Sequence, residues 1–362
     1  MDREVTFLTQ LAERPEDRSL RLVFADWLQE QGDPRGEVIA LCARGDLSLT
    51  EQRKVARLTT QLAARWLGPL ARVADLHRTR FVDGFLTELV ASVRPEVTWG
   101  SLVGDPRLAT VTSFVVPPTQ ESSELRAFVC HPVLRRLRRL ELGSTDWRAL
   151  RFVDDAPCKP ETVVVSSWGT FTRELAGLTE APLFRGGRVL GLATTEFING
   201  LVVNDVFDTL VAQSNQVAWF DAVVLSSRYG IFEGSAAWLL KADELSRAMP
   251  AVRTWGVEAG DVSFTRTFEA GRWGHLEVDL SLPDGLGERQ LAPGQTKSTI
   301  EVRVATAASV LVLLGPARIS SVEIKLAKGA RLRPQERNTL LVAARRWGSL
   351  ERFVVHGETV LP

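Results

Sequence analysis

Few residues in this chain stand at the spacings that catalysis or metal binding requires. The four histidines, at positions 77, 131, 275 and 356, are scattered, and only His131 has a second ligand type beside it, Cys130. Neighbouring residues on a helix point about 100° apart, so this pair would chelate a metal poorly. The chain also lacks the phosphate-loop pattern GxxxxGK and the serine-elbow pattern GxSxG. We therefore expect no catalytic residue, no cofactor and no metal ion.

The densest group of like charges comprises Arg135, Arg136, Arg138 and Arg139. A nucleic-acid site would need these arginines on one exposed face, but strand alternation and helical spacing both divide them. The whole chain has 44 basic and 44 acidic residues, so no overall field attracts phosphate backbones or anionic lipid. We expect no nucleic-acid partner and no membrane partner.

The composition indicates a folded protein of a reducing compartment. Of 362 residues, 45% are apolar and 24% are charged, as in globular domains. Cys42, Cys130 and Cys158 lie far apart without CxxC spacing, and no run approaches the ~20 apolar residues of a membrane span. We expect a cytoplasmic protein in which a small domain is joined to a repeat array, whose core grows by stacking.

A repeated strand pattern indicates the elements that would position a site. The segment Leu137-x-x-Leu140-x-Leu142 has the apolar spacing of a leucine-rich-repeat strand, which buries alternate side chains on one face. Looser versions occur around residues 114, 163, 190, 223, 255, 276, 300, 322 and 353. Helical patterns alternate with them at 122–130, 171–178, 204–212, 236–248 and 334–347. The expected fold class is α/β, with a small helical domain over residues 1–80 and an irregular leucine-rich-repeat-like βα solenoid over residues 81–362.

The N-terminal domain is expected to contain four helices. Their apolar stripes cover residues 3–13, 17–32, 33–41 and roughly 50–73, with Asp17 and Asp33 as capping residues and Gly32 closing the second helix.

One segment of this domain, Arg-Leu-Val-Phe-Ala-Asp-Trp-Leu-Gln-Glu-Gln-Gly-Asp-Pro-Arg-Gly-Glu at 21–37, resembles the bacterial repeat-companion domain. That domain is a short helical module that precedes leucine-rich-repeat-like arrays in large bacterial paralogous families. Residues 80–89, Arg-Phe-Val-Asp-Gly-Phe-Leu-Thr-Glu-Leu, resemble the segment that leads such domains into their first strand. The resemblance implies architecture and bacterial origin, and it implies no activity. Asp26, Asp33, Arg35 and Glu37 of the motif could form a recognition patch, although helix capping by Asp33 and a core position for Trp27 would explain most of the motif.

The region from 262 to 314 departs from the repeat pattern. Residues 262–282 contain two alternating runs around a glycine-containing turn, which predicts an antiparallel hairpin. Residues 283–298 lack periodicity and are expected to form a loop. Strands are expected to resume at 300–304 and 310–314.

The candidate functional surface is the sheet face opposite the core, which would be the concave face of a solenoid. Its positions are apolar at first and charged, mainly acidic, later: Val115, Val164, Gly191, Ala193, Val224 and Ser226, then Glu258, Glu277, Asp279, Glu301, Arg303, Glu323, Lys325 and His356. We expect a protein partner to bury the apolar part and to be oriented by the charged part. β-propensity alone could also place the valines.

The sequence thus predicts a non-enzymatic protein-interaction module and leaves its partner and oligomeric state open. The alternative is an enzyme whose catalytic residues are dispersed along the chain, with residues 262–298 as a lid. A deep cleft holding convergent Asp, Glu or His would favour that enzyme.

Overall fold

The computed structural model shows a mixed α/β protein made of two compact units. The first unit comprises residues 1–161 and 181–186, and the second comprises residues 162–180 and 187–362. No helix in the part described combines the length and apolar character needed to cross a bilayer. The structure describes residues 3–14, 17–92, 99–116, 127–143, 158–167, 187–194, 200–212, 214, 220–227, 232–259, 262–268, 274–280, 300–314, 319–326, 331–346 and 350–361.

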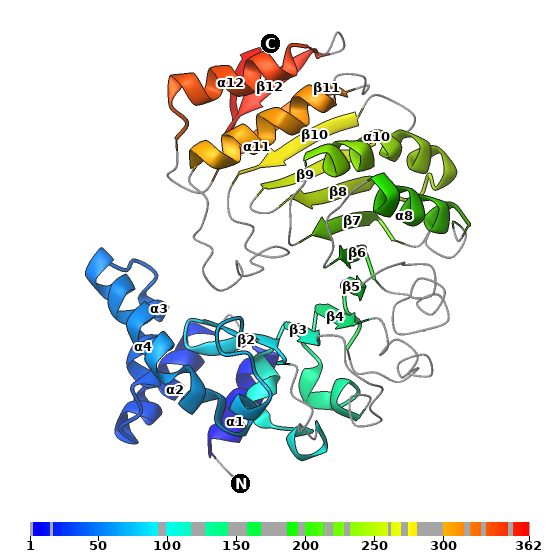
Figure 1. Cartoon of the computed structure of the whole chain (residues 1–362). Coiled ribbons are helices and arrows are strands. Elements are labelled where there is room, and N and C mark those ends of the chain that lie inside the picture. Colours follow the sequence, from blue (N-terminus) through cyan, green and yellow to red (C-terminus); the bar gives the residue numbers. More distant parts are fainter. Residues whose placement is uncertain are drawn as a thin grey trace. The chain divides into compact units, whose positions relative to one another are not determined.

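Helices α1 (Arg3–Glu13), α2 (Arg18–Glu30), α3 (Arg35–Arg44) and α4 (Leu49–Leu67) open the first unit (Figure 1). The predicted caps of α2 and α3 are confirmed. The Asp17 carboxylate accepts a hydrogen bond from the amide of Leu20 at 3.0 Å, and that of Asp33 accepts one from the amide of Arg35 at 2.9 Å. Both carboxylates satisfy amides that have no partner within the helix.

Helix α4 begins with a capping box, in which Ser48 and Glu51 each accept from the other's backbone amide. The prediction that this helix reaches residue 73 is wrong. Gly68 has a φ of +54° and is followed by Pro69, which lacks the amide needed to continue the helix. The chain proceeds instead as the 3-10 helix η1 (Gly68–Arg72).

The first unit also contains strands β1 (Arg80–Val82), β2 (Phe85–Val90), β3 (Ser113–Val116) and β4 (Arg139–Gly143). Short 3-10 helices η2 (Trp99–Leu102), η3 (Pro106–Thr110) and η4 (Pro132–Leu134) lie between the later strands. The β1–β2 pair is antiparallel, whereas β2–β3 and β3–β4 are parallel. Asp83 and Gly84, with φ of +53° and +81°, form a two-residue turn that matches the twist of a hairpin.

The second unit contains a sheet whose neighbouring strands follow chain order. The strands are β5 (Thr162–Ser167), β6 (Val189–Thr194), β7 (Ala222–Ser227), β8 (Thr254–Ala259), β9 (Val262–Thr267), β10 (Gly274–Asp279), β11 (Ile319–Lys325), β12 (Arg352–Val355) and β13 (Glu358–Leu361). Strands β5 to β8 pair in parallel, and so do β10, β11 and β12. Strands β9 and β13 are antiparallel to their neighbours. The strands predicted around 163, 190, 223, 255, 276, 322 and 353 are confirmed.

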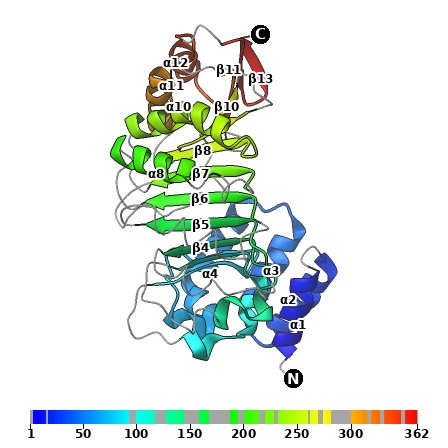
Figure 2. The ribbon, with the colours of Figure 1, turned by 90° about the vertical axis from the view of Figure 1, so that its right-hand side faces the viewer.

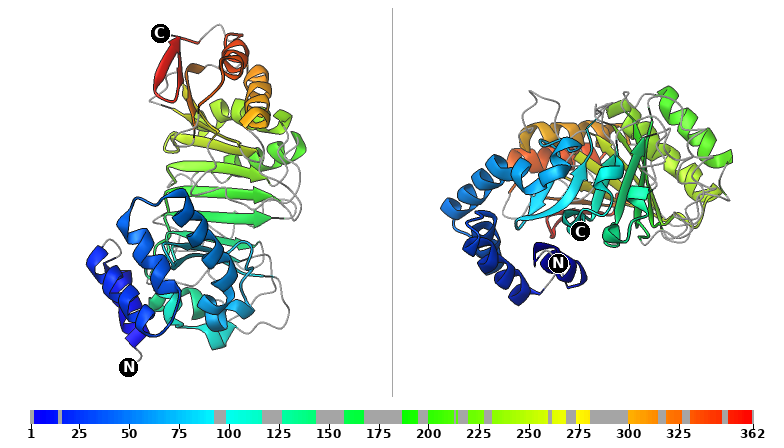
Figure 3. Two further views of the ribbon diagram at one scale, coloured as in Figure 1. Left: turned by 90° about the vertical axis from the view of Figure 1, so that its left-hand side faces the viewer. Right: turned by 90° about the horizontal axis from the view of Figure 1, so that it is seen from below.

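Helices cover one face of this sheet. They are α8 (Gly200–Ala212), α10 (Phe232–Ala248), α11 (Ile300–Leu313) and α12 (Pro334–Ala344), and Figures 2 and 3 show them on one side of the strands. Trp238 of α10 packs against Trp255 of β8 at 6.1 Å between ring centroids, and its indole N–H donates to the carbonyl of Gly256 at 2.8 Å. Trp255 therefore faces the helices, and by alternation the side chains at 254, 256 and 258 face the opposite side. Predicted helices at 204–212, 236–248 and 334–347 are confirmed, the last ending earlier at Ala344, while those at 122–130 and 171–178 lie wholly or mostly outside the described residues.

The strands predicted at 300–304 and 310–314 are wrong, because one helix, α11, covers both segments. Five alternating residues, Ile300 to Val304, suit a strand or the start of a helix equally well. The whole segment from 300 to 313 identifies a helix, because its buried residues recur at helical spacing and face the sheet. They are Val304, Ala307, Ala308 and Leu311. The predicted loop at 283–298 lies outside the described residues.

The hairpin predicted at 262–282 is confirmed as β9 and β10, which pair antiparallel. Its proposed role as a lid is wrong for its described part. Strand β9 pairs with β8 on its other side and β10 pairs with β11, so both strands lie inside the sheet and cannot open over a site. The start of the strands near residue 80 agrees with the sequence, and a domain boundary at that point stays a prediction.

Candidate functional site

The candidate site lies on the face of the second unit's sheet opposite the helices, which we call the open face. Cross-strand register aligns its central row as Val164, Gly191, Val224, Gly256, Thr265, Glu277, Glu323 and Val354. This row changes from small and apolar side chains at β5 to β8 to polar and charged ones at β9 to β11. The change agrees with the order expected from the sequence.

The apolar end of the open face is closely packed. Val164 is only 2% exposed, and a Cβ added at Gly191 would lie 2.9 Å from one of its methyl carbons. Val224 covers Gly256 in the same way, with a methyl carbon 3.1 Å from the position of an added Cβ. Each valine thus lies over a glycine of the next strand, and Val224 retains partial exposure. Glycine at both positions gives the valines room to pack down onto the sheet.

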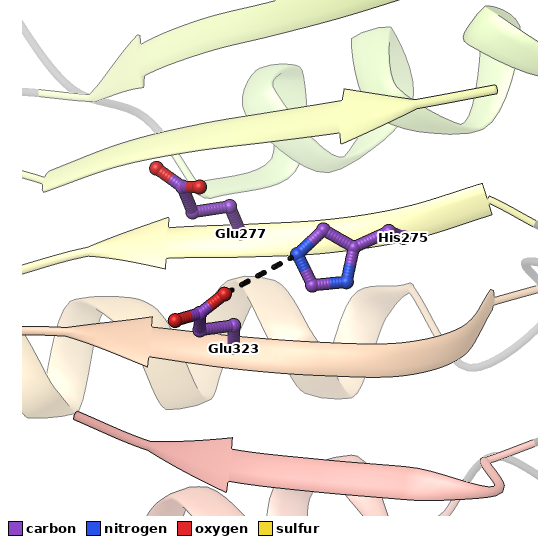
Figure 4. Close-up of side chains that lie close together, drawn as sticks. All are labelled: His275, Glu277 and Glu323. Atoms are coloured by element: carbon purple, nitrogen blue, oxygen red, sulfur yellow. Dashed lines mark ion pairs between the residues drawn. The ribbon is translucent and has the colours of Figure 1, made fainter. Parts of the chain in front are cut away.

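A polar cluster occupies the open face of β10 and β11. Its members are His275 and Glu277 of β10 with Ser321, Glu323 and Lys325 of β11, and Figure 4 shows the imidazole and two of the carboxylates projecting from the same side. His275 Nδ1 lies 2.9 Å from the Ser321 hydroxyl, and its Nε2 lies 3.7 Å from a carboxylate oxygen of Glu323. One ligand atom from each of His275, Glu277 and Glu323 can be chosen so that all three lie within 4.8 Å of one another.

Electrostatics make this cluster an acidic surface with one cation in it. Lys325 Nζ lies 2.6 Å from a carboxylate oxygen of Glu277, and this hydrogen bond, with the charges of Glu277, Glu323 and Asp279, raises the pKa of Lys325. Asp279 pairs in register with Lys325. Three carboxylates therefore lie around one ammonium group, and exposed Arg352 of β12, the register partner of Ser321, adds a second cation at the edge of the cluster. The carboxylates still outnumber the cations, which leaves an excess of negative charge. The side chains of His275 and Lys325 are 39% and 46% exposed, so a partner or an ion can reach them.

The structure distributes the remaining predicted site residues unevenly. Val115, on β3 of the first unit, and Glu258, on β8, are buried, and they offer a partner little surface. The side chain of Ser226 lies outside the described residues. The placement of Glu301 and Arg303 on the strand face is wrong, because both belong to α11, where the Arg303 guanidinium donates to the carbonyl of Leu280 at 2.9 Å.

Sequence reasoning missed His275 and Ser321 as members of the cluster. His275 lies two residues before Glu277, and strand alternation alone would have placed both side chains on one face. The contribution of Ser321 depends on the register of β10 against β11, which the sequence does not state.

Arg21 and Arg35 of the N-terminal motif have a structural role. Arg35 is buried, its Nε donates to the carbonyl of Gly84 at 2.7 Å, and its guanidinium carbon lies 5.7 Å from the ring centre of Phe24 and 5.8 Å from that of Phe85. An ion pair of 3.3 Å joins it to Glu4. Burial lowers its pKa to about 10, while Glu4 and Asp33 partly offset this effect. A second link joins Arg21 to Asp83 at 3.3 Å. The two segments that carry the family resemblance therefore contact each other through Arg35 and Arg21.

Two further candidates from the sequence also have local partners. Arg135 forms an ion pair with Glu13 at 3.2 Å, and Arg139 forms one with Glu141 at 3.0 Å. The His131 ring accepts from the amide of Val133 at 3.2 Å, at the start of η4.

In comparisons with family models, with curated proteins and with solved structures, no match to this chain was found.

Proposed function

We propose that this chain is a protein-interaction module of leucine-rich-repeat-like solenoid type, and that the open face of its second unit binds a protein partner. The observation that carries the proposal is the polar cluster of β10 and β11, which lies half-exposed on a face that no described helix covers. Extended strands present side chains at fixed spacing, which suits recognition of an extended or convex surface.

The partner's chemistry follows from the charge of the cluster. Glu277, Asp279 and Glu323 outnumber Lys325, so a basic surface on the partner would bind here with a salt-dependent association rate. Partly exposed Thr265 adjoins the cluster, and partly exposed Val224 lies in the same row two strands beyond Thr265. Both supply contact area of lower polarity. The proposal therefore restricts the contact region to β7–β11, because the valine of β5 is already buried within the protein.

The resemblance to the bacterial repeat-companion domain forms part of the same proposal. It is supported by the contacts between segments 21–37 and 80–89, which make the motif one packing unit. The role of the first unit would then be architectural. Cytoplasmic location and bacterial origin stay predictions.

The experiment is a capture assay with the purified full chain and a matched pair of charge reversals. Glu277→Lys with Glu323→Lys reverses two charges on the open face, and Asp208→Lys with Glu244→Lys reverses two exposed charges on the helical face. We expect wild type and the helical-face variant to retain the same protein, and the open-face variant to lose it, with weaker retention by wild type at high salt. If the open-face variant is folded and retains that protein with full affinity, the proposal is refuted.

A further inference from the structure

We propose that His275, Glu277 and Glu323 bind a divalent transition-metal ion on the open face of β10 and β11. This inference goes beyond the proposed function, because it concerns the isolated chain and requires no protein partner. The three side chains come from adjacent parallel strands. Glu277 and Glu323 are direct register partners, and His275 lies two residues before Glu277 on the same face of the sheet.

The geometry is close to that of a three-ligand site. Zinc bonds to imidazole nitrogen and carboxylate oxygen are about 2.0–2.2 Å long, so two ligand atoms in tetrahedral coordination lie about 3.4 Å apart. The three ligand atoms here lie within 4.8 Å of one another, and small rotations of the side chains would bring them to that spacing. The side chains are half-exposed, so water can complete the coordination shell.

The imidazole is already oriented for this role. Ser321 contacts Nδ1 at 2.9 Å, and this contact directs Nε2 toward the two carboxylates. A hydrogen bond on the second ring nitrogen is the usual support of a metal-bound histidine, because it fixes the direction of the nitrogen that binds.

The donor set restricts the class of ion. One nitrogen with two carboxylates suits Zn²⁺ and the neighbouring divalent ions of the first transition row. Ca²⁺ takes six to eight oxygen ligands and Mg²⁺ prefers oxygen with several waters, so neither is a good match. The excess of carboxylates over Lys325 also favours a dication at this position.

Lys325 is the competitor of the metal, because it contacts the Glu277 oxygen that would bind the ion. The pair is half-exposed, and such pairs contribute little, so a bound ion can displace the ammonium group at a cost of about two- to fivefold in affinity. Removing the ammonium should therefore strengthen metal binding, whereas removing a ligand should weaken it.

The test is calorimetric titration of the metal-stripped full chain with Zn²⁺, and with Ca²⁺ and Mg²⁺ in separate runs. We expect one Zn²⁺ site per chain and weaker or no binding of the other two ions. His275→Gln and Glu323→Gln should each lower the Zn²⁺ affinity at least about tenfold, and Lys325→Met should raise it about two- to fivefold. Circular dichroism of each variant checks the fold, and the two ligand variants serve as independent tests should one of them unfold.

His77→Gln is the matched control, because His77 is an exposed histidine of the first unit. It should leave Zn²⁺ binding unchanged. The inference is overturned if wild type binds no Zn²⁺, if the folded His275 and Glu323 variants bind it as tightly as wild type, or if the His77 variant loses the site. None of these outcomes depends on a protein partner, so they are separable from failure of the capture assay.

Discussion

Replacement of Arg35 tests whether the N-terminal motif is held together by packing or by charge. Arg35 is 3% exposed and lies among Phe24, Phe85 and the carbonyl of Gly84, with Glu4 as its ion-pair partner. Two substitutions separate the contribution of packing from that of charge. Arg35→Met keeps the length of the side chain and its contact with both rings but removes the charge, whereas Arg35→Ala removes both.

The magnitudes can be worked out from these contacts. Lowering the pKa of Arg35 to about 10 corresponds to about 3 kcal/mol against the charged form, and the methionine variant recovers this cost. The same variant leaves the buried Gly84 carbonyl without its donor, which costs about 1–3 kcal/mol. The attraction of Glu4 is already contained in the net pKa shift of Arg35. The two effects range from cancellation to a net gain of about 2 kcal/mol, so Arg35→Met should be as stable as wild type or up to about 2 kcal/mol more stable. Arg35→Ala adds a cavity between the two rings and should be about 2–5 kcal/mol less stable than the methionine variant.

Hydrogen exchange of peptides from α2 and α3, followed by mass spectrometry, is the suitable assay, because a chain with two units need not unfold in one step. Arg53→Met and Arg53→Ala, on the exposed side of α4, are the controls and should leave exchange unchanged. Equal destabilisation by the methionine and alanine variants would refute the reasoning, since it would mean that hydrogen bonds and charge outweigh packing around Arg35.

Three further predictions follow from turns, a cap and a buried indole. Gly84→Ala should cost more stability than Gly357→Ala in thermal unfolding: both glycines have φ above +80°, but an added Cβ would lie 2.7 Å from a side-chain carbon of α3 only at position 84. Hydrogen bonds from the backbone amide and hydroxyl of Ser48, the N-cap of α4, together with one from Arg44, lower the pKa of Glu51 to about 2. This contribution is complete above pH ~4.3 and is lost as the pH falls towards 2. The protection factors of α4 amides, which correct exchange for the fall of its intrinsic rate with pH, should therefore decrease on acidification in wild type and not in Glu51→Gln, and an identical pH profile in both would contradict the assignment. Trp238→Phe removes the indole hydrogen bond to the Gly256 carbonyl and should cost about 0.5–1.5 kcal/mol, and an unchanged melting temperature would show that this hydrogen bond is unimportant.

The elements that local chemistry specifies could be predicted from the sequence, and those that depend on distant pairing could not. Asp17 and Asp33 cap their helices because a carboxylate satisfies amides within three residues of it, so the signal is contained in a few letters. The segment from Ile300 to Val304 alternates as a strand does, and only the burial pattern of the following ten residues shows that it begins a helix.

The candidate site was predictable in part for the same reason. Strand alternation places Glu277 and Glu323 on the face opposite the core, as the sequence indicated. His275 contacts Glu323 and Ser321 only because β10 and β11 pair in one particular register. The two strands are more than 40 residues apart in the sequence, so this register is established only on folding. The burial of Val164 was equally hidden, because strand alternation shows which face a side chain occupies and not how closely its neighbours pack against it.

The two-residue turn at His356 and Gly357, like the one at Asp83 and Gly84, is formed by residues adjacent in sequence, and each closes a hairpin. The parallel strands of the second unit differ from these hairpins, because β6 pairs with β5 in the same register as β7 pairs with β6. Deleting residues 189–221 would bring Ala222 against Thr162, where Val189 now pairs, and would leave the closing hairpin untouched. Removing or adding one strand-and-helix segment would therefore change the area of the open face by a fixed step and leave the closing hairpin unchanged.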